Sequence, residues 1–528
     1  MQSPRQLLAS ASLQLRKPRF GLSPFALAVI LFAVAKFAAH MFTAQNGGYY
    51  CDELYAIDMS KHLAFGYVDL PPLVPALIAL TRLVFGDSLL AIHFMPALAG
   101  VGTLVFISLV TREFGGRLFA TVITGLCFLM NTFWLCASTY FGYDSFDQLL
   151  LAIFLFLLVR FLKTENKRLW IGLGLAAGIA LLAKTTILYY GPGFLIALLV
   201  SKHRKDLLTG WPWLGVGVFV VVVSPYLAWA IANHWPTLEY WGNYHARLYP
   251  ASPLEYFAAI FVTFNPVAFP IIAAGLYRIF RRFQGTNYYF LGILFLTSTV
   301  FLFELHARYH LLFALFGPLI AAGSVFFEQA LSKIKWRAWI QAVSIALLAA
   351  AGATALPSSL PMLAPQDMRQ YDNVFGFYFR EVKFDSNPPP VFPLIYGYRR
   401  GWETLAKTVS QVYHGLSEED RAQCGGILTD WFGPAGAVNF YGPKYGLPPA
   451  VSGHLNYYLW GPGDSSWEVM IAVTWFGGDL NKVFGYVLPV GRLNNPNSGP
   501  GMSGIPIYIC KNPVVPIKDA WPYFKAYN

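Results

Sequence analysis

The sequence predicts a polytopic α-helical membrane protein with a small α/β domain at its C-terminal end. Of the 528 residues, 56% are hydrophobic and only 12% are charged, too little charge to cover a soluble protein of this size. Many apolar runs approach the roughly 20 residues that cross a hydrocarbon core. The net charge of +11 does not indicate nucleic-acid binding, because the basic residues form short clusters between the apolar runs.

The apolar runs predict about eleven crossings within residues 1–357. The first, Pro24–Phe42, follows a basic N-terminal stretch and indicates an uncleaved signal anchor. The run Leu73–Phe85 is too short to cross and predicts a surface or re-entrant helix. The remaining predicted spans are Leu89–Val110, Leu118–Ala137, Gln148–Leu162, Leu169–Ala183, Ile187–Val200, Trp213–Ala232, Phe257–Phe280, Tyr288–Phe303, Leu311–Phe327 and Trp339–Pro357.

Lysine and arginine are distributed along the chain as the positive-inside rule requires. With the N-terminus placed inside, most basic residues fall in inside loops. The outside loops hold only Lys61, Arg82, Lys184, Arg247 and Arg308. The rule therefore predicts a cytoplasmic N-terminus and makes residues 43–88 the first outer loop. An odd number of crossings also puts residues 358–528 outside.

Residues 358–528 predict the small α/β domain, because short buried strands alternate there with helical segments. Proline-rich punctuation separates this part from the last span. The predicted helices are Trp402–Leu416 and Ala435–Tyr441, and the predicted strands are Gly426–Thr429, Val469–Thr474 and Ile505–Cys510.

The first outer loop, residues 43–88, carries the carboxylates Asp52, Glu53, Asp58 and Asp69 between two strongly apolar regions. Asp52 and Glu53 open a predicted short helix, and as an adjacent pair at a bilayer boundary they are the better candidates for chemistry. A carboxylate at that position could also serve merely as a helix cap. For Asp58 and Asp69 we favour the simpler interpretation of ordinary acidic residues in an outer loop.

A second outer loop, Tyr140–Asp147, brings Asp144 and Asp147 to the same membrane face as Asp52. Carboxylates that converge from two loops can act as a general base or supply hard oxygen ligands to a divalent cation such as Mg²⁺ or Mn²⁺. The sequence leaves both interpretations open. Asp52 and Asp144 are the metal-ligand candidates, and no cofactor is required by any motif.

Two cations lie at the outer boundary, where the positive-inside rule predicts few. Lys184 sits between two spans, and Arg308 is followed by Tyr309 and His310. Such cations suit a lipid phosphate or pyrophosphate, or else they snorkel to ordinary headgroups. The sequence contains no P-loop, GxGxxG, HExxH or GxSxG motif, so it predicts no site for cytosolic nucleotide chemistry.

The run YYCDELYAIDMSKHLAFGYVDLPPL, residues 49–73, resembles the first outer loop of bacterial GT-C fold glycosyltransferases. This group is related to the dolichyl-phosphate-mannose protein mannosyltransferases and the aminoarabinose transferase of lipid A. The runs YFGYDSFDQLL, LWIGLGLAAGIALLAKTTILYY and NFYGPKYGLP are similar to the same group, and the resemblance covers nearly the whole chain. Relatives often have HPPL where this chain has Leu70–Leu73, so a histidine that could contact donor or metal is missing.

The resemblance implies an enzyme of the bacterial inner membrane with a periplasmic C-terminal domain. It implies inverting transfer of a hexosyl or pentosyl group from a polyprenyl-phosphate donor to a glycan, lipid or protein acceptor. By position, Asp52 matches the family's base, Glu53 its partner, and Asp144 the residue that supports the acceptor or a cation. Lys184 and Arg308 would bind the donor phosphate. Asp147, Tyr309 and His310 are the supporting candidates.

A transporter or lipid flippase with an extracytoplasmic binding domain is the competing hypothesis. Broken helices and carboxylates buried at the middle of the membrane would favour it. The acidic residues of this chain instead cluster at the outer edge, and its two halves do not resemble each other. Both observations favour the transferase.

Overall fold

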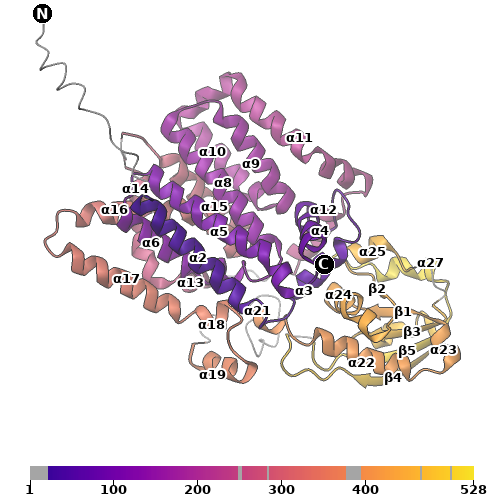
Figure 1. The fold of residues 1–528 in the computed structure, drawn as a ribbon. Coiled ribbons are helices and arrows are strands. Elements are labelled where there is room, and N and C mark those ends of the chain that lie inside the picture. The colour runs from indigo at the N-terminus through magenta and orange to yellow at the C-terminus, as the bar shows by residue number, and fades with distance from the viewer. Residues whose placement is uncertain (1–21, 248–251, 282–284, 376–393, 464–466, 500–501) are drawn as a thin grey trace, which may run out of the picture.

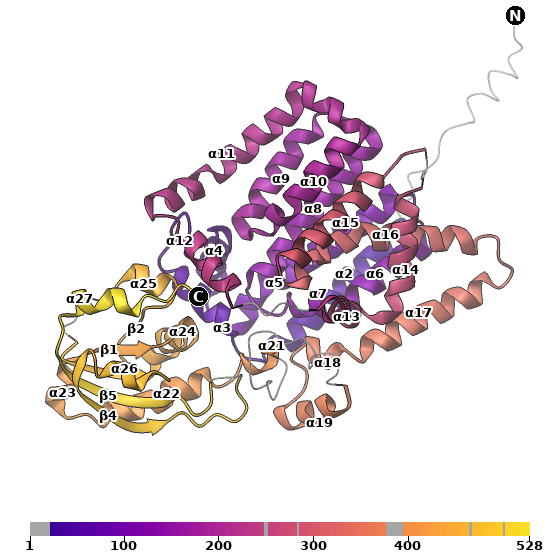
Figure 2. The same cartoon turned by 180° about the vertical axis from the view of Figure 1, so that it is seen from behind.

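The computed structural model describes residues 22–247, 252–281, 285–375, 394–463, 467–499 and 502–528 (Figure 1). The basic N-terminal stretch lies outside these residues. The part before residue 354 is a bundle of helices. A sheet flanked by short helices, which we call the C-terminal α/β region (residues 402–528), adjoins one end of the bundle (Figures 1 and 2).

Five segments of the described chain are long and apolar enough to cross a membrane. They are α2 (Pro24–Thr43), α5 (Leu89–Glu113), α8 (Tyr143–Thr164), α11 (Gly210–Ala232) and the segment Tyr309–Leu331, which contains η3 (Tyr309–Leu312) and α16 (Phe313–Leu331). Shorter apolar helices accompany them: α4 (Leu73–Phe85), α6 (Leu118–Leu129), α9 (Leu169–Ala183), α10 (Thr186–Val200), α15 (Tyr289–Glu304) and α17 (Arg337–Ala353). These helices agree with the predicted helical membrane fold, while the number of crossings stays a prediction.

Two predicted spans are interrupted, so the prediction of one continuous helix is wrong for each. Within Leu118–Ala137, α6 ends and α7 (Thr132–Cys136) begins anew, because the side chain of Asn131 accepts a hydrogen bond from the Trp134 amide (3.0 Å) and caps a second helix. Within Phe257–Phe280, α13 (Pro253–Thr263) and α14 (Phe269–Ile279) meet at 94°. Asn265 has a positive φ of 63° and precedes Pro266, which together end the helix.

Glycines allow helices of the bundle to approach closely. A side-chain carbon added to Gly174 of α9 would lie 2.0 Å from the carbonyl oxygen of Gly215 in α11. One added to Gly275 of α14 would lie 1.9 Å from the carbonyl oxygen of Leu319 in α16. Contacts between small residues are the usual basis of helix association in a membrane, where lipid provides no hydrophobic driving force. They fix the bundle that carries the residues of the cavity described below.

The C-terminal α/β region contains a mixed five-stranded sheet in the order β2-β1-β3-β5-β4. Strand β1 is parallel to β2 and β3, and β5 is antiparallel to β3 and β4. The strands are β1 (Cys424–Thr429), β2 (Ala450–Ser452), β3 (Val469–Val473), β4 (Phe484–Arg492) and β5 (Pro506–Pro513). Strands β1, β3 and β5 and helices α22 (Trp402–His414) and α24 (Phe432–Tyr441) lie where the sequence predicts such elements. The edge strands β2 and β4 were not predicted, because β2 is short and β4 is exposed and interrupted by proline and glycine.

Smaller helices complete the fold. They are α3 (Cys51–Met59), α12 (Pro236–His245), α18 (Leu356–Ser359), α19 (Pro365–Phe375), α21 (Leu394–Gly397), α23 (Glu418–Ala422), α25 (Asn456–Trp460), α26 (Gly477–Leu480), α27 (Ile517–Ala520), η1 (Lys202–Leu208), η2 (Pro266–Ala268), η4 (Gly442–Tyr445) and η5 (Trp521–Phe524). Helix α3, in the predicted first outer loop, lies between the bundle and the C-terminal α/β region (Figure 1).

Candidate active site

A clamp of hydrogen bonds on Glu53 fixes the start of α3. The amide of Tyr50 donates to Glu53 Oε2 (2.7 Å), and the amide of Phe141 donates to Oε1 (2.6 Å). His93 Nε2 of α5 lies 3.0 Å from Oε1. Burial raises the pKa of Glu53, but the His93 ring and the peptide N–H groups outweigh it and hold the pKa below its ordinary value. Glu53 thus ties α3 to α5 and to the segment before α8.

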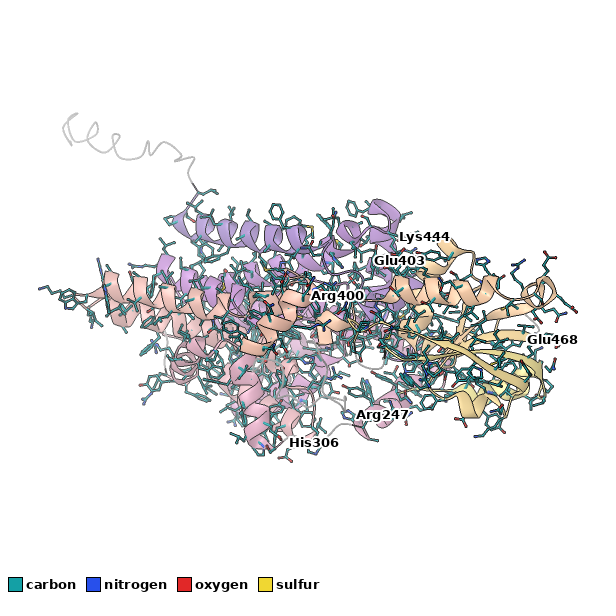
Figure 3. The ribbon with its side chains drawn as sticks, turned by 90° about the horizontal axis from the view of Figure 1, so that it is seen from below. Arg247, His306, Arg400, Glu403, Lys444 and Glu468 are labelled. Carbon is teal, nitrogen blue, oxygen red and sulfur yellow. The ribbon has the colours of Figure 1, made fainter. Side chains whose placement is uncertain are left out.

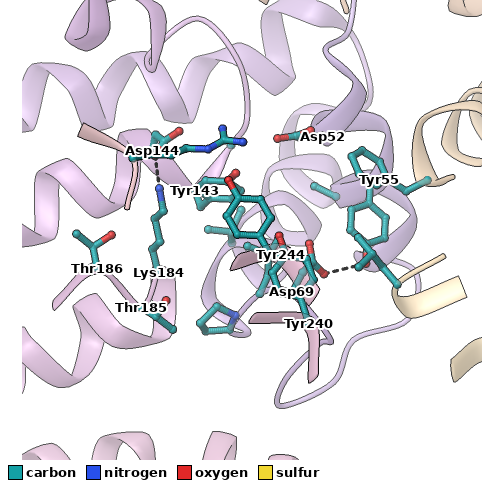
Figure 4. A pocket seen from close by; sticks show the side chains of 18 of the residues that line it. Asp52, Tyr55, Asp69, Tyr143, Asp144, Lys184, Thr185, Thr186, Tyr240 and Tyr244 are labelled. Carbon is teal, nitrogen blue, oxygen red and sulfur yellow. Dashed lines mark hydrogen bonds and ion pairs between the residues drawn. The ribbon is translucent and has the colours of Figure 1, made fainter. Parts of the chain in front are cut away.

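A cavity of about 430 Å³ opens beside the N-terminal end of α3 (Figure 4). The bundle contributes to its walls through α3, the start of α8, the junction of α9 and α10, α12, and the segment before η3. Its charged and titratable lining residues include Asp52, Asp69, Asp144, Lys184, Arg308 and His310. Carboxylates and cations from five separate segments therefore face one enclosed space.

Asp52 occupies the first turn of α3, where the amide groups of a helix terminus favour a carboxylate. The thiol of Cys51 donates to its Oδ1 at 3.2 Å. Burial, together with the smaller effect of Asp144, raises the pKa of Asp52 to about 6, against the opposing effects of the Cys51 hydrogen bond and of Arg308. A carboxylate with this pKa can accept and release a proton near neutral pH, which is what a general base requires.

Asp144 and Lys184 form an ion pair across the cavity. Lys184 Nζ donates to Asp144 Oδ1 at 2.6 Å (Figure 4). The hydroxyl of Tyr140 donates to Asp144 Oδ2 at 3.1 Å. Asp144 lies in the first turn of α8, while Lys184 adopts an extended conformation between α9 and α10. Its ammonium also lies 4.4 Å from the centre of the Tyr143 ring. The break between α9 and α10 is therefore what brings this lysine to the cavity.

The segment around η3 supplies the second cation. The guanidinium of Arg308 lies 5.5 Å from the centre of the Tyr244 ring, and the ring of His310 stacks on Phe133 at 5.1 Å. Arg308 and His310 both line the cavity. The hydroxyl of Tyr309 instead lies 3.2 Å from Thr263 Oγ1.

Five of the predicted site residues thus meet at the cavity: Asp52, Asp144, Lys184, Arg308 and His310. Glu53, Asp147 and Tyr309 are not among the described residues that line it. Glu53 and Asp147 are fully buried instead, in α3 and in the second turn of α8.

Comparison with known proteins identifies the fold. Residues 69–229 match the family model described as dolichyl-phosphate-mannose-protein mannosyltransferase. Lipid A galacturonosyltransferase RgtD of Rhizobium johnstonii is 27% identical over 278 residues, which are 50% of this chain and 55% of that protein. The chain therefore matches about half the length of this curated relative. ArnT from Cupriavidus metallidurans, solved bound to undecaprenyl phosphate and in the apo state, aligns with a TM-score of 0.57 and 14% identity, covering 91% of this chain and 97% of that one.

These matches make the chain similar to membrane glycosyltransferases, as the resemblance to the GT-C group predicts. The predicted resemblance and the predicted polytopic helical GT-C fold are thereby confirmed. The segment that matches the mannosyltransferase family model includes Asp69, Asp144 and Lys184, whereas Asp52 and Arg308 lie outside it.

Asp69 is a cavity residue of this GT-C relative that sequence reasoning missed. The hydroxyl of Tyr55 donates to Asp69 Oδ1 at 3.0 Å (Figure 4). Asn456 Nδ2 lies 3.4 Å from the same oxygen. Burial raises the pKa of Asp69 to about 7, against the opposing effect of the Tyr55 hydroxyl. One feature of the sequence could have indicated Asp69: it precedes Leu70, the position where relatives often have a histidine, and the double proline Pro71–Pro72.

Aromatic side chains from the C-terminal part of the chain form another wall of the cavity, and they too escaped prediction. Tyr398, Trp431 and Phe432 line it. Phe432 stacks on Tyr55 of α3 with ring centres 5.0 Å apart, and Tyr398 contacts Trp431 edge-on at 6.0 Å. The GT-C bundle therefore does not enclose the cavity by itself.

The residues of the cavity do not fit a divalent cation. Asp144 already holds the ammonium of Lys184, so it is not a free hard-oxygen ligand beside Asp52. Across the described ranges, no three His, Cys, Asp or Glu side chains are grouped as a metal would need.

Proposed function

We propose that this protein is a glycosyltransferase of the bacterial inner membrane that moves a sugar from a polyprenyl-phosphate donor to a hydroxyl group of a glycan, lipid or protein. The observation that carries the proposal is one cavity that combines a titratable carboxylate, Asp52, with the cations Lys184 and Arg308 on a GT-C fold. In the proposed orientation the N-terminus is cytoplasmic, and the cavity and residues 358–528 are periplasmic. The undecaprenyl phosphate of the ArnT structure supports the choice of donor.

The proposed reaction is a direct displacement at the anomeric carbon. Asp52 accepts the proton of the acceptor hydroxyl while the oxygen of that hydroxyl bonds to the anomeric carbon. The bond from this carbon to the phosphate oxygen breaks, and its electron pair leaves with the polyprenyl phosphate. Attack opposite the leaving group inverts the configuration. Because the lipid phosphate is already an activated leaving group, no nucleotide is needed.

Lys184 and Arg308 supply the electrostatic part of the proposed mechanism. Charge on the phosphate grows as the sugar departs, and cations in a poorly solvated cavity stabilise that charge more strongly than they would in water. The ion pair with Asp144 holds the flexible side chain of Lys184 in the cavity. Asp144 is thus proposed to orient this cation. His310, which also lines the cavity, is proposed as a supporting residue.

The competing hypothesis of a lipid flippase has one feature in its favour, the broken pair of helices α13 and α14. A flippase moves the intact lipid-linked sugar across the bilayer, whereas a transferase releases the free polyprenyl phosphate. Release of free polyprenyl phosphate therefore distinguishes a transferase from a flippase.

The deciding experiment uses the full-length protein in proteoliposomes with an undecaprenyl-phosphate-linked sugar. Released undecaprenyl phosphate and the glycosylated acceptor are both measured. We expect Asp52→Asn to lower the rate by about 10²–10⁴-fold, the usual contribution of a general base. Asp479→Asn is the matched control, because Asp479 is an exposed carboxylate that is paired with Lys482 and does not line the cavity. Full activity of Asp52→Asn would exclude it as the base, and movement of intact donor without release would favour the flippase.

The sugar and the acceptor can be identified in a deletion strain. Loss of the enzyme should leave one envelope glycan, lipid or protein without a single sugar and should cause the lipid-linked form of that sugar to accumulate. Mass spectrometry of the lipid and glycan fractions detects both changes. A strain that shows neither change, while the purified protein is also inactive, would contradict the proposed function.

A further inference from the structure

We infer that the C-terminal α/β region positions the catalytic helix α3, and that Asp58 is the positioning residue that joins the two. The inference rests on the proposed function, in which Asp52 at the start of α3 is the base. It assigns a role to Asp58, which the sequence had presented as an ordinary loop acid, and to the C-terminal region, which would otherwise be only a cover over the cavity.

Asp58 is a buried carboxylate with donors from both parts of the chain. Its side chain is 3% exposed, and Lys61 Nζ donates to Oδ1 at 2.8 Å. Asn439 Nδ2 of α24 and the hydroxyl of Tyr457 of α25 donate to Oδ2 at 2.7 and 2.6 Å. A buried charge is tolerated only when it is fully hydrogen-bonded, so the end of α3 is bound to these two helices.

The backbones of α24 and α3 also lie in close contact. A side-chain carbon added to Gly436 of α24 would lie 2.9 Å from the carbonyl carbon of Leu54 in α3. Only glycine lets the two helices come this close. The amide group of Asn439 is itself oriented by the sheet, because its Oδ1 accepts a hydrogen bond from the Ala450 amide of β2 at 2.8 Å. The sheet therefore fixes Asn439, and Asn439 fixes Asp58.

A second anchor holds the other side of the same loop. Asn456 Oδ1 accepts a hydrogen bond from the Val68 amide at 3.1 Å, and its Nδ2 donates to the Tyr55 hydroxyl at 2.5 Å. Tyr55 in turn donates to Asp69. The C-terminal α/β region thus holds the loop both at the helix that bears Asp52 and at the segment that bears Asp69.

The length of α3 explains why this support matters. A helix of nine residues is not stable in isolation, so its order depends on the contacts of its eight buried residues. Asp52 lies at one end of the helix and Asp58 near the other, so release of the Asp58 end changes the position of Asp52. A misplacement of about 1 Å at a reacting group can cost on the order of 10²-fold in rate.

The test is a charge exchange between Asp58 and Asn439 in the full-length protein. Asp58→Asn removes the charge and replaces one acceptor oxygen by an NH2 group, which must face either the ammonium of Lys61 or the donors of Asn439 and Tyr457. Asn439→Asp places two carboxylates face to face. Each single variant should lower kcat at least tenfold, with KM for the undecaprenyl-phosphate-linked sugar changed less than threefold. The double variant restores a carboxylate–amide pair, and its kcat should return to within threefold of the wild type. The inference would be overturned if the kcat of the double variant fell by the product of the two single-variant decreases.

The matched control is Glu403→Gln, which removes an exposed ion pair with Lys444 (2.7 Å) from the same region (Figure 3). It should leave kcat unchanged. Amide hydrogen exchange of residues 51–59 provides a readout independent of activity. Exchange should be faster in Asp58→Asn and slow again in the double variant, and unchanged protection in both would overturn the inference. A wild type that transfers no sugar would refute the proposed function alone, since the exchange data still decide whether the C-terminal region orders α3.

Discussion

Lys184 is bound to Asp144 by a hydrogen bond of 2.6 Å, so the cation proposed for the donor phosphate already has an anionic partner. A phosphate that enters the cavity competes with this carboxylate for the same ammonium. Asp144 therefore sets both the place of Lys184 and the strength with which Lys184 binds phosphate.

This competition predicts opposite effects for the two members of the pair. Lys184→Met removes a charge-assisted hydrogen bond to the phosphate and should weaken binding of undecaprenyl phosphate by about tenfold or more. Asp144→Asn removes the competing charge and should bind the lipid at least as tightly as the wild type, while kcat falls because the lysine is less well oriented. Binding titrations with undecaprenyl phosphate measure this, with the exposed Lys202 changed to methionine as control. Equal weakening by both variants would contradict the competition.

The raised pKa of Asp52 predicts the pH dependence of transfer. A base must be deprotonated to accept a proton, and the pKa of Asp52 is about 6. The rate should therefore rise with pH through about 6, and any further rise near pH 7 would come from Asp69, whose variant is described below. A profile of kcat/KM between pH 5 and pH 8 measures the acid limb. A rate that falls with rising pH in this range would show that the group must be protonated.

The clamp on Glu53 predicts a loss of stability rather than a specific loss of chemistry. Glu53→Gln replaces one acceptor oxygen by an NH2 group that faces the donor amide of either Tyr50 or Phe141, which should destabilise the protein by about 1–3 kcal/mol. Thermal unfolding in detergent measures the effect, and Glu165→Gln at an exposed position is the control. The pKa of Glu53 is lowered in the folded state, so the clamp is fully stabilising above the ordinary value of 4.5 and is lost as the pH falls through the lowered pKa. The difference between variant and wild type should narrow at acid pH, and a difference that widens there would contradict the clamp.

Asp69 predicts a variant whose defect depends on pH. Its pKa of about 7 means that it is mostly protonated at pH 6 and mostly ionised at pH 8. Asparagine is neutral at both values and resembles the protonated form. Asp69→Asn should therefore match the wild type at pH 6 and transfer several times more slowly at pH 8, if the ionised carboxylate accepts a hydrogen bond from a substrate hydroxyl. Equal ratios at both pH values would leave Asp69 without a role in binding.

The parts of the fold that could be predicted are those set by the composition of a short stretch of sequence, above all the helices of the bundle. The apolar runs predicted the helices, and the short apolar run Leu73–Phe85 predicted α4 with the same bounds. The two interrupted spans could not be foreseen from hydropathy, because the break depends on single residues, Asn131 and Asn265, whose side chain or backbone conformation ends a helix.

The candidate site likewise contains residues that the sequence predicts and contacts that it does not predict. Asp52, Asp144, Lys184 and Arg308 were predicted because each is a charged residue at the boundary of an apolar run. Glu53 also satisfied that criterion, but its partner His93 is a lone histidine in an apolar helix, and no sequence pattern connects the two. The same holds for contacts between the first loop and the C-terminal part, since side chains that are distant in sequence leave no periodicity to detect.

Asp58 and Asn439 are 381 residues apart in the sequence, yet they meet in one hydrogen bond. During synthesis the helix that bears Asp52 enters the membrane early, whereas its support is translated near the end of the chain. On the proposed topology, this support must also cross the bilayer before it can reach α3. If Asp58 positions α3 as inferred, an unfinished chain lacks the support for the helix that bears Asp52, and the proposed transfer requires a complete chain.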